Sequence, residues 1–102
     1  MASIKLTADI PLDEIDRLDI LLKKYLPTLK AKKRAMIVLH LIDIAGEIPN
    51  FEKCYTALVQ SEEISEDNLA DCMEEMEISI IHMLNHMKDL KPLLKQAVDA
   101  LP

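Results

Sequence analysis

A row of side chains able to bind metal or transfer protons lies in the C-terminal third of the sequence. Its members follow one another at steps of three and four residues, so on an α-helix they would form one edge: Cys72, Glu75, Ser79, His82, His86 and Asp89. His82 and His86 are one helical turn apart and can share a zinc or copper ion, with Asp89 as a further ligand or an orienting carboxylate. Metal binding through His82, His86 and Asp89 is therefore one hypothesis for the function.

The same spacing is also typical of the polar edge of an amphipathic helix. The row contains no H-E-x-x-H, C-x-x-C or Glu-x-x-His motif of the kind that marks metal sites. A further ligand would have to come from His40 or from Cys72 of a second subunit. We interpret His40 and Asp43 instead as buried polar groups paired with Tyr25 or Tyr55. Metal binding is thus the alternative, not the leading hypothesis.

The residue pattern gives little support for catalysis or for copper(I) binding by methionine. The chain has a single glycine, so it cannot build a phosphate-binding loop. Cys72 lies among acidic residues, which disfavour a reactive thiolate. The methionines of the same region would suit copper(I), but their helical spacing is explained by packing, or by a groove that accepts a partner helix. We therefore predict no enzymatic activity.

The clearest pattern is an apolar seam that alternates steps of four and three residues over the last third of the chain. It consists of Leu69, Met73, Met76, Ile80, Met83, Met87, Leu90, Leu94, Ala97 and Leu101. This is the heptad spacing of a packed helix, which would be roughly 50 Å long. Because a small monomer can hardly cover such a helix, we predict an isologous homodimer. The predicted interface is Met73, Met76, Ile80, Met83, Leu84, Met87, Leu90 and Leu94.

Helix-breaking residues divide the rest of the chain. We predict an N-terminal arm over residues 1–10 and helices at about 12–26, 28–45, 51–60 and 66–100. Gly46 is expected to cap the second helix, Asn50 to begin the third, and Ser65 to begin the fourth. Pro92 falls opposite the seam, where a kink is expected. The prediction is a single all-α domain, a four-helix bundle with one long C-terminal helix, completed by dimerisation.

Charge is divided between two parts of the chain. The net charge of −6 and the pI near 4.9 disfavour binding to nucleic acid. Half of the basic residues fall between residues 23 and 34, whereas residues 62–77 carry many acidic side chains and no basic one. One interpretation is that the two blocks lie near each other, within one chain or across a dimer, and select the register and orientation of the packed helices. The alternative is that they dock onto a charged partner.

The two cysteines, Cys54 and Cys72, both lie within helical patterns and are expected to be free thiols. With no apolar run long enough to span a membrane and no signal peptide, this predicts a cytoplasmic protein. Half of the residues are apolar, which is a large share for a chain of 102 residues. We therefore predict a small acidic helical protein that acts by protein–protein association, as an adaptor, assembly factor or inhibitor.

Overall fold

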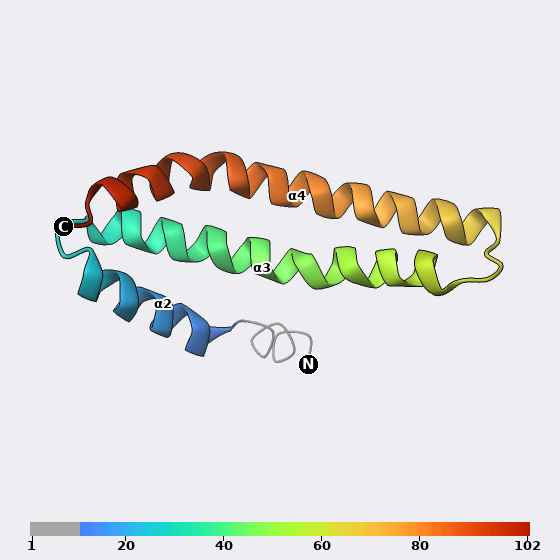
Figure 1. Ribbon diagram of the computed structural model, residues 1–102, viewed down its shortest axis with the longest axis horizontal. Helices are drawn as coiled ribbons and strands as arrows, with labels where there is room; N and C mark the ends of the chain where they lie inside the picture. Colours follow the sequence, from blue (N-terminus) through green and yellow to red (C-terminus); the bar gives the residue numbers. More distant parts are fainter. Residues whose placement is uncertain (1–10) are drawn as a thin grey trace, which may run out of the picture.

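The computed structural model describes residues 11–102, which form three α-helices and, within that range, no strand (Figure 1). They are α2 (Leu12–Tyr25), α3 (Ala31–Gln60) and α4 (Glu66–Asp99). α3 and α4 form a long antiparallel hairpin, and α2 packs on α3 but not alongside α4. The predicted all-α class is confirmed for this part of the chain. The predicted arm, residues 1–10, lies outside the described residues.

α2 begins and ends almost where the sequence predicts. Pro11 precedes its first residue, and Asp13 and Glu14 place negative charge at the positive end of the helix dipole. Tyr25 is its last residue, because Pro27 disfavours helical conformation at Leu26. Leu26 instead turns inward and is buried. α2 is thereby anchored at its C-terminal end to the core of the hairpin.

α3 differs most from the prediction. It runs without interruption through Gln60, whereas the sequence predicted two helices, at about 28–45 and 51–60, with a loop between them. Gly46 lies inside the helix and is not a C-cap, since it lacks the positive φ that such a cap uses. The described residues therefore form three helices where four were predicted.

Pro49 also lies inside α3. Its missing N–H cannot bond to the carbonyl of Ala45, and a proline at an interior position costs about 3 kcal/mol. Asn50 does not begin a helix as predicted, and its side-chain amide donates to Glu47 Oε1 at 3.4 Å. α3 packs against α4 on both sides of Pro49, and this packing offsets the cost of the proline. The residue pattern around Pro49 does not reveal this packing, because it depends on residues of α4.

α4 confirms the predicted long helix to within one residue at its C-terminal end. The Ser65 hydroxyl accepts a hydrogen bond from the backbone N–H of Asn68 at 3.2 Å, as expected of an N-cap. Pro92 lies inside α4 and does not start a new helix. Its side chain is exposed, so the helix keeps its packed face through this position.

The contact between α3 and α4 has heptad spacing on both helices. On α4 the residues that are not exposed form what we call the inner seam: Leu69, Cys72, Met76, Ser79, Met83, His86, Leu90, Leu93 and Ala97. The matching residues on α3 are Lys33, Ile37, His40, Ile44, Glu47, Phe51, Cys54 and Leu58, and Ser61 follows just beyond its C-terminal end. The inner seam is apolar near the α2 end, where Ile37, Leu90 and Leu93 form the core with Leu26 and Ala97.

The inner seam differs from the seam that the sequence predicted. The two share Leu69, Met76, Met83, Leu90 and Ala97. From each shared position the inner seam continues three residues later, for example at Ser79 and Leu93, whereas the predicted seam continues four residues later, at Ile80 and Leu94. Positions i+3 and i+4 lie on either side of position i on a helix. α4 therefore has two apolar faces, and only one of them contacts α3.

Candidate functional site

The second apolar face of α4 is exposed along most of the helix. We call its apolar residues the outer strip: Met73, Ile80, Leu84, Met87, Leu94 and Val98. Their exposed fractions range from 41% to 65%, although most were predicted as interface residues. Exposed apolar side chains are ordinary when scattered singly, but a row of them along one helix is a candidate contact surface.

α3 adds apolar residues to the same side of the hairpin. Ile48 and Tyr55 are exposed, and each lies four residues after an inner-seam position of α3, Ile44 and Phe51. Because both helices are right-handed and run antiparallel, the i+4 side of each helix points to the same face of the pair. The outer strip is therefore the α4 half of a wider apolar face.

The middle of the α3–α4 contact is polar. His40 from α3 and His86 from α4 face each other with their Nδ1 atoms 3.0 Å apart, so one ring donates a hydrogen bond to the other. Asp43 Oδ2 lies 3.6 Å from Nε2 of His86. His40 and Asp43 thus find their partner in His86, not in Tyr25 or Tyr55 as predicted, and both tyrosines are exposed.

Glu47 is the centre of a second polar cluster about two turns along α3. Ser79, buried on α4, donates to Glu47 Oε1 at 3.0 Å, and Nδ1 of His82 lies 3.6 Å from Oε2. Burial raises the pKa of Glu47, but the hydrogen bonds from Ser79 and Asn50 and the nearby His82 outweigh burial and hold that pKa below its usual value. The cluster therefore fixes an ionised carboxylate between the two helices.

The residues proposed from the sequence as metal ligands do not converge on one point. His82 lies against Glu47, His86 lies against His40, and Asp89 is exposed. Nowhere in residues 11–102 do three or more side chains of His, Cys, Asp or Glu come together as metal ligands would. The sequence proposed His86 as a metal ligand beside His82, whereas its contact in the structure is His40 on another helix, which spacing along α4 could not reveal.

Cys54 and Cys72 are free thiols, as predicted. Cys54 is buried and donates from Sγ to Glu75 Oε2 at 3.2 Å. This hydrogen bond to a carboxylate raises the pKa of the Cys54 thiol, and burial acts in the same direction. The thiol is therefore held in its protonated form, which suits packing and not nucleophilic attack. The pairing of Cys54 with Glu75 was not predicted.

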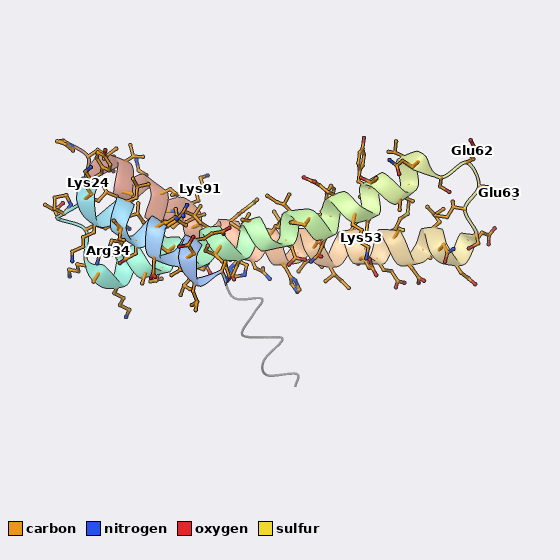
Figure 2. The ribbon with its side chains drawn as sticks, turned by 90° about the horizontal axis from the view of Figure 1, so that it is seen from below. Lys24, Arg34, Lys53, Glu62, Glu63 and Lys91 are labelled. Atoms are coloured by element: carbon orange, nitrogen blue, oxygen red, sulfur yellow. The ribbon has the colours of Figure 1, made fainter. Side chains whose placement is uncertain are left out.

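The two charge blocks lie at opposite ends of the hairpin. Figure 2 shows Lys24, Arg34 and Lys91 toward one end and Glu62 and Glu63 at the turn between α3 and α4. Arg34 Nε donates to Asp19 Oδ1 at 2.8 Å, so part of the basic block pairs within the chain. The acidic and basic ends do not meet in one molecule, because the molecule measures 54 Å along its longest axis.

Comparison of the chain with protein-family models, with curated proteins and with solved structures finds no match. No helix within residues 11–102 is long and apolar enough to cross a membrane. The function must therefore be inferred from the surfaces and clusters described above.

Proposed function

We propose that the protein acts by protein–protein association, as an adaptor, assembly factor or inhibitor without catalysis of its own. The observation that carries this proposal is the outer strip, an apolar row on α4 that α3 and α2 leave exposed. Methionine and branched aliphatic side chains of this kind suit a surface that receives an apolar helix. The partner would contribute the helices needed to complete a four-helix bundle, and a second copy of the chain is one such partner.

The chemistry of the polar groups supports association and not turnover. The Ser79 hydroxyl and the Cys54 thiol at the helix contact each donate a hydrogen bond to a carboxylate, Ser79 to Glu47 and Cys54 to Glu75. A nucleophile, a base and an oxyanion donor are not brought together by these pairs. Two free thiols also suit a reducing compartment such as the cytoplasm.

Site-specific photo-crosslinking tests the proposal directly. A photoreactive amino acid in place of Met87, in the outer strip, should yield a covalent adduct with a protein when cells expressing the chain are irradiated. The same amino acid in place of Asn85 is the control, because Asn85 is exposed and lies on the opposite side of α4. Equal labelling from both positions, or none from Met87, would rule out the outer strip as the binding surface.

A further inference from the structure

The outer strip is part of a complete second heptad seam. When the charged residues between its apolar members are included, the steps alternate between four and three: Met73, Glu77, Ile80, Leu84, Met87, Lys91, Leu94 and Val98. We call this set the outer seam. Every member is exposed and all lie within α4. Such spacing is the pattern of a helix that packs along its length against another helix. The occupant is therefore a helix that lies alongside α4.

The outer seam contains one acidic and one basic residue, and both lie at the same distance in sequence from Leu84. Glu77 lies seven residues before Leu84 and Lys91 lies seven residues after it. If a second α4 ran parallel and in register, Glu77 would face Glu77 and Lys91 would face Lys91. If it ran antiparallel about a two-fold axis at Leu84, each Glu77 would instead face the oppositely charged Lys91 of the second copy.

We infer that the outer seam binds a second copy of this chain in antiparallel orientation, with the two-fold axis at Leu84. This inference rests on the proposed association through the outer strip and adds the partner and its orientation. In this arrangement the outer seam is self-complementary: Ile80 and Met87 flank Leu84 on either side, and two Glu77–Lys91 pairs close the contact.

The ends of the hairpin favour the same orientation. Glu62 and Glu63 lie at the turn, and Lys24 and Arg34 lie toward the other end (Figure 2). An antiparallel pair brings the acidic end of each copy to the basic end of the other, whereas a parallel pair brings like charges together at both ends. The acidic and basic ends, which do not meet within one molecule, would thus meet between two.

Charge exchange at Glu77 and Lys91 tests the orientation. Sedimentation of the full-length wild type should give a dimer whose dissociation constant rises with salt. Glu77→Lys and Lys91→Glu each create two like-charge pairs, and each should weaken the homodimer about tenfold or more. An equimolar mixture of the two variants should recover tight dimers, because every pair in the heterodimer is again of opposite charge. The double variant should also dimerise like the wild type.

Asp71→Lys and Lys53→Glu are the matched controls. Asp71 on α4 and Lys53 on α3 are exposed and lie on the side of the hairpin away from the outer seam, and the substitutions change the net charge as the test variants do. Neither control should weaken the dimer. Test variants that dimerise as tightly as their controls would overturn the antiparallel arrangement.

The same measurements separate this inference from the proposed function. A wild-type chain that stays monomeric while the photoreactive residue at position 87 labels a different protein would overturn self-association and leave association through the outer strip standing. A chain that is monomeric and labels nothing would overturn both.

Discussion

At the scale of single residues, the contact between α3 and α4 includes polar pairs as well as apolar packing. Glu47 accepts from Ser79, and His40 meets His86, at positions where a coiled coil ordinarily has aliphatic side chains. Buried polar groups are costly unless they find their partners, so these pairs favour one register of α3 against α4. A shift by one helical turn would separate both pairs at once.

Because the pKa of Glu47 is lowered in the folded state, the stability of the fold depends on pH. Above its ordinary pKa, about 4.5, the carboxylate is ionised in both states and its native contacts contribute fully. As the pH falls through the lower native pKa, the native carboxylate takes up its proton and this contribution is lost. We expect the unfolding temperature to fall between about pH 5 and about pH 3, and to fall less in Glu47→Gln.

Glu52→Gln is the matched control, because Glu52 is an exposed glutamate on the same helix. Thermal unfolding followed by circular dichroism at both pH values measures the effect. An identical acid dependence in the wild type and in Glu47→Gln would show that Glu47 contributes no stabilisation as an ion.

At the scale of elements, α3 shows how packing overrides local helix-breaking residues. Gly46 and Pro49 are three residues apart, and either would end an isolated helix with ease. Both are exposed, however, and the α3 residues that contact α4 continue on either side of them, at Ile44 and Phe51. The helix continues because interrupting it would remove the second half of α3 from α4.

Gly46→Ala tests this continuity. A methyl group at Gly46 would meet no atom within 4 Å, and the backbone there is helical. Alanine loses less conformational entropy in a helix than glycine does, so the free energy of unfolding should rise by about 1 kcal/mol. Denaturant titration measures the change. Ala45→Gly, at an exposed neighbouring position, should lower stability by a similar amount. Destabilisation by Gly46→Ala would instead indicate a break between two helices.

At the scale of the whole molecule, α4 has one face that packs on α3 and another, exposed face that we propose for association. Met83 and Met87 are one turn apart, but Met83 belongs to the inner seam and is half-buried, whereas Met87 belongs to the outer strip. The two methionines are equivalent in type and in predicted role. Substitution of each by aspartate therefore separates the contributions of the two faces.

Met83→Asp should destabilise the fold by several kcal/mol, because it buries an unpaired charge against α3. Met87→Asp should change the stability of the isolated chain by no more than about 0.5 kcal/mol, as expected for an exposed position, and should abolish association. Denaturant unfolding and sedimentation, measured on both variants, separate these effects. If Met83→Asp were tolerated while Met87→Asp unfolded the chain, the assignment of the two faces would be reversed.

The sequence by itself determined the elements whose signals are local. Asp13 and Glu14 mark the first turn of α2, Pro27 its end, and Ser65 the start of α4. The heptad spacing of α4 also predicted a long packed helix, and the basic and acidic blocks were visible as separate stretches. Each of these follows from backbone geometry, capping or helical periodicity over a few turns.

Only the tertiary structure decided which face of α4 packs on α3. The inner seam, which runs through Ser79, and the seam predicted from the sequence, which runs through Ile80, both have heptad spacing from Met76. The residues found only in the predicted seam are the more apolar ones, yet they are exposed. In the buried row Ser79 meets Glu47, His86 meets His40 and Leu93 joins the core with Ile37, and all of these contacts join residues far apart in the sequence. Continuity of α3 through Pro49 has the same origin. Interactions between distant residues set both features, and no local pattern encodes them.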